Sequence, residues 1–302
     1  MDAQRDIETS QVRRVGHVTL TTPDIAKQVE YYTNVLGLTL VDQTTKRAIL
    51  AAPSGQEAVV LELGDAAHCK SLALQVAPKC DLEQLGSRLS SQGISWEQRH
   101  DITPGVSHAI TFDDPNGVRL ELFADCRFAE SDAPESGIQP FKLGHVAFIS
   151  PDVRSTVDFY TQILGFRISD WRGDFFVFMR CCPDHHSVNF VQGDAASLHH
   201  IAFEVRDSTE IQRACDYLAR KDIRLVLGPI RHIIGHNIAI YHKNDDQLLV
   251  ELFTEIDQMK DEELGYFDPR PWHQDRPQRP KTWGPHTLTN YWGPGRLVSR
   301  DP

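Results

Sequence analysis

The sequence predicts an α+β fold of two similar domains, each made of tandem βαβββ units in which a strand and a helix are followed by further strands. The first indication is a repeat, because GHVTLTTPDIAKQVEYYTNVLGL at Gly16 recurs as GHVAFISPDVRSTVDFYTQILGF at Gly144. A second is the fainter return of the same pattern at Lys70 and at His199. Within each unit the hydrophobic period changes from two to 3.6. The chain is therefore a duplication of paired units.

Each opening strand leads into a predicted helix. An apolar stripe at helical spacing marks it: Ile25, Val29, Tyr32 and Leu36 in the first copy, and Val153, Val157, Tyr160 and Leu164 in the second. Asp24 and Asp152, each preceded by proline, stand where N-caps are expected. Gly37 and Gly165 follow the last periodic residue, as helix-terminating glycines do.

Short strands follow the first helix of each copy. They are RAILAAP, AVVLELG and HAITFDD in copy one, and FFVFMRC, SVNFVQG and NIAIYHK in copy two. We expect an N-terminal arm at 1–14, a first domain at 15–124, a linker at 125–141, a second domain at 142–256 and an extension at 257–302. The extension is rich in Pro, Trp and Arg, which excludes one long helix and predicts a segment packed along the body or against another subunit.

Composition limits the function classes. The net charge of -11 over 302 residues argues against a nucleic-acid or anionic-membrane partner, which would need clustered Lys and Arg. No apolar run is long enough to span a membrane, and the polar N-terminus lacks a signal-peptide core, so we expect a cytoplasmic protein. The six cysteines show no paired spacing and are expected to be free thiols.

Three residues of the second copy form a candidate metal site. His145 lies on the opening strand of the third unit, His200 on that of the fourth, and Glu251 on the closing strand LLVELF. If the paired units curve their sheets toward each other, these side chains meet in one concavity. Two histidines and one carboxylate leave half of a coordination sphere open, which is the arrangement of non-haem Fe(II) oxygenases.

The first copy lacks the middle ligand. Ser71 aligns with His200, whereas His17 and Glu121 align with the other two ligands. A site without its middle ligand would bind metal weakly, so we expect one metal per chain, in the second copy. We interpret His17 and Glu121 as buried hydrogen-bonding groups.

Three more polar residues occur only in the second copy. They are His186, His232 and Tyr241, which align with Glu57, Ile102 and Thr111. An imidazole beside an open metal position can exchange protons with bound oxygen, and a phenol can hold a ligand oxygen in one protonation state. Strand alternation and the alignment with Gly144-His145 favour His186 over His185, and His200 over His199.

The motifs GHV, DHHSVNF, LHHIAF, RHIIGH, AIY and VELF, spread over two modules, resemble one family. The family that they resemble is the type I extradiol ring-cleavage dioxygenases, such as catechol 2,3-dioxygenase and 2,3-dihydroxybiphenyl 1,2-dioxygenase. These enzymes belong to the vicinal oxygen chelate superfamily, which has the glyoxalase/bleomycin resistance/dioxygenase fold. The resemblance covers residues 15–285. The KTW sequence at 281–283 is similar to the extension of catechol 2,3-dioxygenases, and the family suggests a homo-oligomer.

The resemblance implies a chemistry. Fe(II), less often Mn(II), would be held by His145, His200 and Glu251. His186 matches the family's acid/base histidine, and His232 and Tyr241 match the pair that contacts the catecholic oxygens. The implied reaction is meta cleavage of a small aromatic diol with O2 to a 2-hydroxymuconic-semialdehyde-type product, in aromatic compound catabolism.

The sequence also suggests which residues line the substrate pocket, and it leaves two alternative functions open. Phe178, Val191 and Ile234 are expected to wall the pocket and suit alkyl or aryl substituents, although Arg231 could pair with an acidic one. A glyoxalase-like lyase or isomerase would use the metal without needing the second set of polar residues. A non-catalytic drug-binding protein of the same fold would not need all three ligands.

Overall fold

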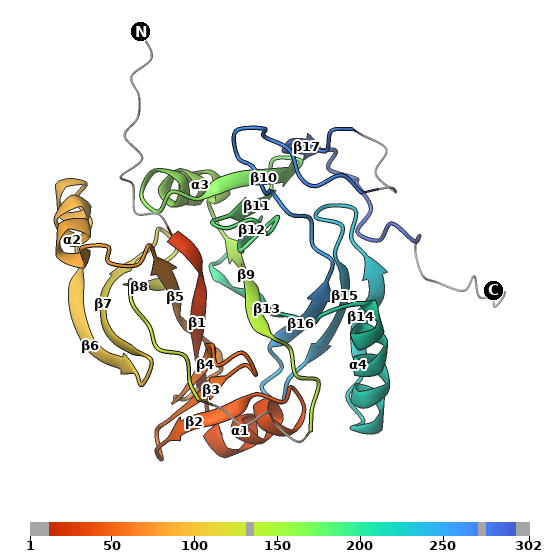
Figure 1. Ribbon diagram of the computed structural model, residues 1–302, viewed down its shortest axis with the longest axis horizontal. Helices are drawn as coiled ribbons and strands as arrows, with labels where there is room; N and C mark the ends of the chain where they lie inside the picture. Colours follow the sequence, from red (N-terminus) through yellow and green to blue (C-terminus); the bar gives the residue numbers. More distant parts are fainter. Residues whose placement is uncertain (1–11, 131–135, 271–275, 294–302) are drawn as a thin grey trace, which may run out of the picture.

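The computed structural model describes residues 12–130, 136–270 and 276–293, and it contains two domains that each enclose a strongly curved sheet (Figure 1). The expected arm at 1–14 lies outside the described residues up to residue 11, and residues 12–14 already belong to the first strand. Parts of the expected linker (131–135) and extension (271–275 and 294–302) also lie outside them. The α+β fold of two similar domains is confirmed.

The first domain contains two βαβββ units. They comprise β1 (Val12–Thr22), α1 (Ile25–Asn34), β2 (Thr39–Gln43), β3 (Arg47–Ala51), β4 (Glu57–Leu63), then β5 (His68–Val76), α2 (Leu82–Ser91), β6 (Glu97–Thr103), β7 (Val106–Asp113) and β8 (Arg119–Phe123). Their eight strands form one sheet in the order β2-β3-β4-β1-β5-β8-β7-β6. The opening strands β1 and β5 therefore lie side by side at its centre.

The second domain repeats this plan and adds one strand. It comprises β9 (Lys142–Ser150), α3 (Val153–Gln162), β10 (Arg167–Arg172), β11 (Phe176–Arg180), β12 (Val188–Gln192), β13 (Ser197–Glu204), α4 (Ser208–Arg220), β14 (Leu225–Arg231), β15 (Ile238–Lys243) and β16 (Leu249–Thr254). The sheet order is β14-β15-β16-β13-β9-β12-β11-β10-β17, in which β17 (Lys281–Trp283) comes from the extension and pairs parallel with β10. The extension thus packs along the body of this domain.

The predicted caps and strands are confirmed. The Asp24 side chain accepts a hydrogen bond from the Lys27 amide at 3.0 Å, and Asp152 accepts one from the Ser155 amide at 3.0 Å. Gly37 ends its helix region with φ +75°, a conformation that favours glycine. All six predicted strand segments form strands. Each pairs an apolar face with the core, as their alternation requires.

The two domains are joined by reciprocal contacts, in which a turn of each domain meets the first helix of the other. The turn after β7 meets α3, where the Tyr160 hydroxyl donates to Asp114 at 3.2 Å. The turn region after β15 meets α1, where Asn244 donates to Gln28 at 3.2 Å. The Tyr31 hydroxyl is also hydrogen-bonded to His242 at 2.7 Å. A continuous apolar core spans both domains, so they form one folded unit.

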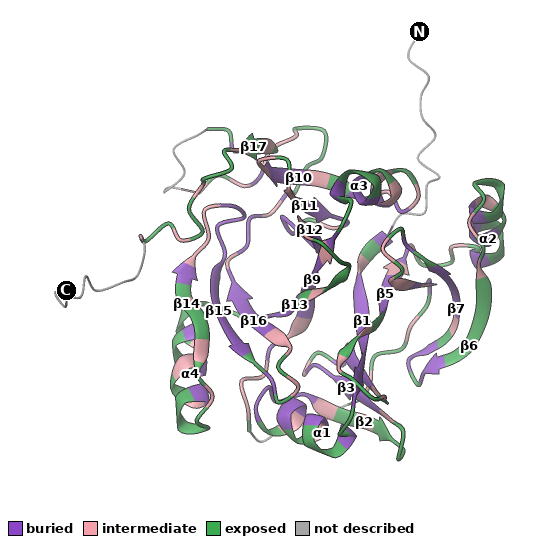
Figure 2. Cartoon of the chain, turned by 180° about the vertical axis from the view of Figure 1, so that it is seen from behind, coloured by how far each residue is buried: buried purple, intermediate pink, exposed green. Residues whose placement is uncertain are grey.

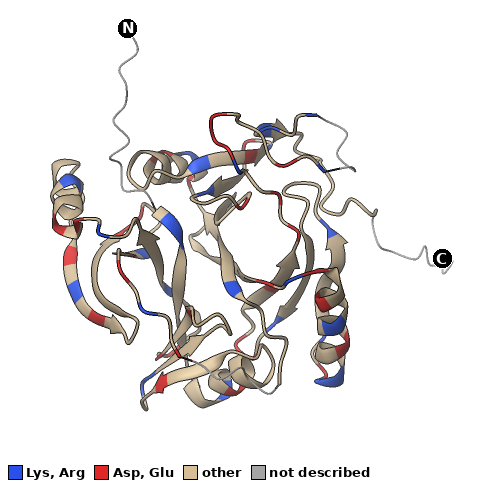
Figure 3. Cartoon of the chain, viewed as in Figure 1, with Lys and Arg blue, Asp and Glu red and all other residues tan. Residues whose placement is uncertain are grey.

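Burial and charge follow this layout. Figure 2 shows β1 and β16 mostly buried, whereas β6 and α2 at the outer edge carry exposed residues. Figure 3 shows acidic and basic residues mixed along β6 and α4. Among the described residues, no helix is both long and apolar enough to cross a bilayer. The cysteines are free.

Candidate active site

Strand pairing brings the three candidate ligands to one face of the second sheet. Ala202 on β13 is opposite His145 on β9 and also opposite Glu251 on β16. His200 lies two residues before Ala202, so strand alternation turns it to the same face. All three ligand side chains are almost fully buried. The site is therefore built on the rigid centre of the sheet.

A glycine precedes the first ligand for a steric reason. A Cβ atom on Gly144 would lie 2.4 Å from Cζ of Phe253, whose ring packs against His145 with centroids 4.8 Å apart. The first domain has the same arrangement, since a Cβ atom on Gly16 would lie 2.6 Å from Cε1 of Phe123. The repeated Gly-His pair thus reflects close packing of the closing strand against the opening strand.

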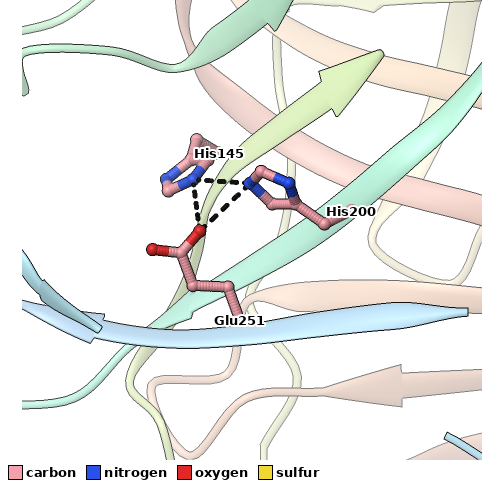
Figure 4. Close-up of side chains that lie close together, drawn as sticks. All are labelled: His145, His200 and Glu251. Atoms are coloured by element: carbon pink, nitrogen blue, oxygen red, sulfur yellow. Dashed lines mark hydrogen bonds and ion pairs between the residues drawn. The ribbon is translucent and has the colours of Figure 1, made fainter. Parts of the chain in front are cut away.

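The ligand atoms converge on one point (Figure 4). The carboxylate oxygen Oε2 of Glu251 lies 3.1 Å from Nε2 of His145 and 3.0 Å from Nε2 of His200, and the two nitrogens are 3.2 Å apart. In octahedral coordination with bonds of about 2.1 Å, neighbouring ligand atoms lie about 3.0 Å apart. The residues therefore fit one face of an octahedral divalent cation.

Electrostatics prepares these groups to bind a cation. Burial alone would raise the pKa of Glu251, but the charges and hydrogen bonds of His145 and His200 outweigh it, and the pKa lies well below the ordinary value. Burial lowers the pKa of His145, and Glu251 opposes this only partly. An ionised Glu251 and a neutral His145 are the protonation states that a metal ion requires of these two ligands.

Neighbouring side chains orient two ligands. Asn237 donates from Nδ2 to Oε1 of Glu251 at 3.1 Å, which leaves Oε2 directed at the histidines. The Nδ1 atoms of His199 and His200 are hydrogen-bonded at 2.6 Å. Such supporting contacts fix ligand orientation and tautomer in metal sites.

The ligands open into a cavity of about 280 Å³. Phe178 and Ile234 line it as expected, but Val191 does not: it lies one pleat further along β12, and Asn189 on the same strand lines the cavity instead. Sequence reasoning missed other lining residues, which are Arg172, Phe176, Asn189, His199, Val226, Leu227, Asn237, Leu249, Leu288 and Thr289. The last two come from the extension.

His186, His232 and Tyr241 also line this cavity. The rings of His186 and His145 have centroids 4.4 Å apart, and Nε2 of His232 is hydrogen-bonded to the Tyr241 hydroxyl at 2.8 Å. Burial, followed by the charges of His145 and His185, holds the pKa of His186 well below its ordinary value. Burial and the charge of Glu251 raise the pKa of Tyr241 well above 10.0. A neutral imidazole and a protonated phenol therefore face the cavity.

Arg231, which the sequence suggested as a partner for an acidic substituent, does not line the cavity. Its guanidinium forms an ion pair with Glu255 at 2.7 Å and donates to the His236 carbonyl at 2.7 Å. Arg172, at the end of β10, lines the cavity instead.

The first domain lacks a comparable site. Nε2 of His17 lies 3.6 Å from Oε2 of Glu121, while the Ser71 hydroxyl donates to Oε1 of Glu121 at 2.6 Å. Glu57, at the position of His186, accepts hydrogen bonds from Thr103 and from the Gly105 amide. Over the described residues, the second-domain triad is the group of His, Cys, Asp or Glu side chains that could hold a metal ion.

Comparison with known proteins agrees with this geometry. The model of the Glyoxalase/Bleomycin resistance protein/Dioxygenase superfamily matches residues 14–122 and 142–252. A manganese-dependent 2,3-dihydroxybiphenyl 1,2-dioxygenase of Geobacillus genomosp. 3 is 26% identical over 78% of this chain and 82% of its own length. An iron-dependent extradiol dioxygenase of Rhodococcus jostii is 24% identical over 83% of this chain and 92% of its own length.

A solved structure shares the two-domain fold. The Mn(II)-bound glyoxalase of Novosphingobium aromaticivorans superposes with a TM-score of 0.82 and 26% identity, covering 95% of this chain and 92% of that one. Together these findings confirm the resemblance carried by the sequence motifs, both in fold and in the dioxygenase relatives.

Proposed function

Because the chain belongs to the Glyoxalase/Bleomycin resistance protein/Dioxygenase superfamily, we propose that it catalyses metal-dependent extradiol cleavage of a catechol with O2. The product would be of the 2-hydroxymuconic-semialdehyde type, in aromatic compound catabolism. One observation carries the proposal: the converging His145, His200 and Glu251 atoms open into a cavity that is also lined by His186 and Tyr241. A purely structural metal site would be closed by a fourth protein ligand.

The proposed cofactor is Fe(II), with Mn(II) as the alternative. Two imidazole nitrogens and one carboxylate suit either cation, and the two dioxygenase relatives differ in metal. When bound, such a cation would lower the pKa of the catechol hydroxyls and bring diol and O2 together. His145, His200 and Glu251 would hold it, and Asn237 would keep the carboxylate aligned.

The polar residues around the cavity supply the proton chemistry. His186 is neutral by burial, so it can accept a proton from the substrate hydroxyl and later return one to the product. Tyr241 stays protonated and can donate a hydrogen bond to a substrate oxygen, while His232 fixes the direction of the Tyr241 hydroxyl. Each role needs only a group already directed at the cavity.

The cavity walls favour a catechol with a hydrocarbon substituent. Phe176 and Phe178 stack with ring centroids 4.4 Å apart on one side, and Leu227 and Leu288 lie among the other lining residues. Burying an alkyl or aryl group against such walls is favourable by about 25 cal/mol per Å². Arg231 is engaged by Glu255, so an acidic substituent would have to pair with Arg172, which lines the cavity at the end of β10.

The alternative function is a glyoxalase-like lyase or isomerase, which the fold of the Mn(II)-bound glyoxalase favours. Such a reaction would use the metal without O2. The paired His232 and Tyr241 and the neutral His186 argue for the dioxygenase, because they provide donors and an acceptor for a diol. A drug-binding protein is disfavoured by the complete ligand set.

The test is anaerobic reconstitution of the full chain with Fe(II) or, in parallel, Mn(II), followed by 3-methylcatechol or 2,3-dihydroxybiphenyl in air. We expect a yellow product and uptake of one O2 per product, and none with the metal-free protein. One tightly bound ion per chain without ring cleavage across a broad catechol panel would overturn the proposal in favour of the O2-independent alternative.

A further inference from the structure

A buried row of polar groups lies behind His186, on the side away from the cavity. The Nδ1 atoms of His186 and His185 are 2.9 Å apart, and Nε2 of His185 lies 3.2 Å from Oδ2 of Asp170 on β10. The side chains of His185 and Asp170 have no exposed surface. Burying ionisable groups is costly unless they are hydrogen-bonded, and each of these two groups is hydrogen-bonded toward the cavity histidine.

The extension supplies hydrogen bonds to Asp170, the residue of this row that lies farthest from the cavity. Trp283 on β17 donates from its indole nitrogen to Oδ2 of Asp170 at 2.7 Å, and the Lys281 amide donates to Oδ1 at 2.8 Å. Both partners are donors only, so the Asp170 carboxyl acts as an acceptor on both oxygens. The pairing of β17 with β10 holds these donors in place.

We propose that Asp170 and His185 are positioning residues that set the tautomer of His186. Because Asp170 accepts, Nε2 of His185 carries a proton, and with one proton on the ring its Nδ1 accepts. The proton of His186 then lies on Nδ1, where it is donated to His185. Nε2 of His186 is left with its lone pair for the substrate. The role of this tautomer in catalysis rests on the proposed function, whereas the tautomer itself follows from the hydrogen bonds alone.

The proton balance is simple. The substrate O–H bond breaks and an Nε2–H bond forms on His186, with no change of oxidation state. The resulting imidazolium keeps its Nδ1–H bond to His185, whose hydrogen bond to the Asp170 carboxylate supports the positive charge. Return of the proton to the product restores the starting state. An Asp–His pair orients a catalytic base in the same sense in serine proteases.

The hydrogen-bonded row His186, His185 and Asp170 is found in the domain that carries the metal ligands and not in the first domain. At the offset of 128 between the repeats, Asp170 corresponds to Asp42, which is exposed on β2. At β12 and β4 the offset is 129, because Val188 pairs with Val146 as Val59 pairs with Val18. His185 therefore corresponds to Gln56, which donates to the carbonyls of Val15 and Gly16 at 3.2 and 2.8 Å. The first domain therefore keeps the aspartate in sequence but not its role, which makes Asp42 a matched control.

The experiment compares Asp170→Asn with Asp42→Asn in the full, metal-loaded chain. With its NH2 group at the Oδ2 position the new amide gives up the hydrogen bond from Trp283 and donates to His185, which would reverse both histidine hydrogen bonds and place the His186 proton on Nε2. We expect kcat to fall about 100-fold, while bound metal and catechol affinity change less than twofold; the corresponding change in serine proteases costs about 10⁴-fold. Asp42→Asn should match the parent enzyme. An unchanged kcat in Asp170→Asn would overturn the proposal.

A second pair of variants separates positioning from folding. His185→Gln offers one acceptor and one donor and should keep kcat within about tenfold, because it preserves the His186 tautomer. His185→Leu should lose kcat as Asp170→Asn does. Equal activity of the two variants, whether high or low, would contradict the tautomer assignment.

A direct readout distinguishes failure of this inference from failure of the proposed function. Nitrogen-15 NMR of histidine-labelled, Zn(II)-loaded protein should show His186 protonated on Nδ1, and on Nε2 in Asp170→Asn. If the parent protein cleaves no catechol but shows this exchange of tautomers, the proposed function fails and the positioning role stands. Nε2 protonation in the parent protein would overturn the inference alone.

Discussion

The two domains place nearly the same strand residues in nearly the same positions, yet only one makes a metal site. In the second domain the closest ligand atoms are 3.0 to 3.2 Å apart, whereas His17 and Glu121 of the first remain 3.6 Å apart. The decisive change is Ser71 in place of His200, because the serine hydroxyl donates to Oε1 of Glu121 at 2.6 Å and places no imidazole nitrogen beside Oε2. A hydrogen-bonded hydroxyl thus stands where the second domain has its third candidate ligand.

The comparison also shows what surrounds a working site. The second domain adds a cavity histidine, a carboxylate-orienting amide and a strand from the extension, and the first domain has none of these at the corresponding described positions. Glu57, where His186 would stand, is tied to Thr103 and the Gly105 amide. The fold therefore does not depend on the ligand set, because the first domain has the same fold without it.

The largest effect is expected from making the second domain resemble the first. His200→Ala removes one of three ligands, so stoichiometric metal binding should disappear and ring cleavage should fall at least about 1000-fold. Ser71→Ala, at the matched position, should leave metal content and rate unchanged. Elemental analysis after dialysis measures the first quantity. Retention of one ion per chain by His200→Ala would exclude the proposed ligand set.

The reverse change should have a smaller effect. Ser71→His supplies the missing ligand type between His17 and Glu121 and should add a second ion per chain, bound about 10- to 100-fold more weakly because the supporting contacts are missing. Equilibrium dialysis against Mn(II) in a His200→Ala background isolates this site. If no ion binds there at millimolar Mn(II), strand position alone does not make a ligand set.

The smallest effect concerns the domain interface and pH. Burial lowers the pKa of His242 to about 4, so the folded state resists the proton that the unfolded chain takes up below about 6.5. His242 therefore contributes stability at neutral pH that is lost as the pH falls from about 6.5 toward 4. The loss between pH 7 and pH 5 is about 2 kcal/mol.

His242→Phe copies Phe112, the matched residue of the first domain, and removes this titration. Urea unfolding at pH 7 and pH 5 should show a pH dependence reduced by about 2 kcal/mol relative to the parent protein. His100→Phe, on an exposed strand, is the control and should keep the parent dependence. Identical pH dependence in all three proteins would refute this role for His242.

The central strands and the helices could be predicted from the sequence because their signals are local. Strands such as Ile238–Lys243 alternate or run apolar, and Asp24 and Asp152 cap helices through their own neighbours. The strands β2, β6, β10 and β14 were not predicted. Residues 97–101 of β6 are all exposed, so no apolar face marks them, and an edge strand pairs on one side only.

In the candidate site, too, some residues could be predicted from local sequence patterns and others could not. The ligand positions follow from strand alternation and the repeat, and His186 rather than His185 faces the cavity. The walls Leu288 and Thr289 could not be inferred, since they reach the cavity through a long-range path of the extension that no periodicity records. Val191 does not line the cavity, because alternation identifies a face of a strand but not how far along it the cavity extends. Asp170 could have been noticed as the aspartate that recurs from Asp42.

The pairing of β17 with β10 has a consequence for the order in which the enzyme is made. A chain synthesised from its N-terminus has all three ligands once Glu251 is present, but it lacks Trp283 and Leu288 until later. Metal capture can therefore precede completion of the cavity and of the hydrogen bonds to Asp170. We therefore expect ring cleavage to require the extension even where metal binding does not.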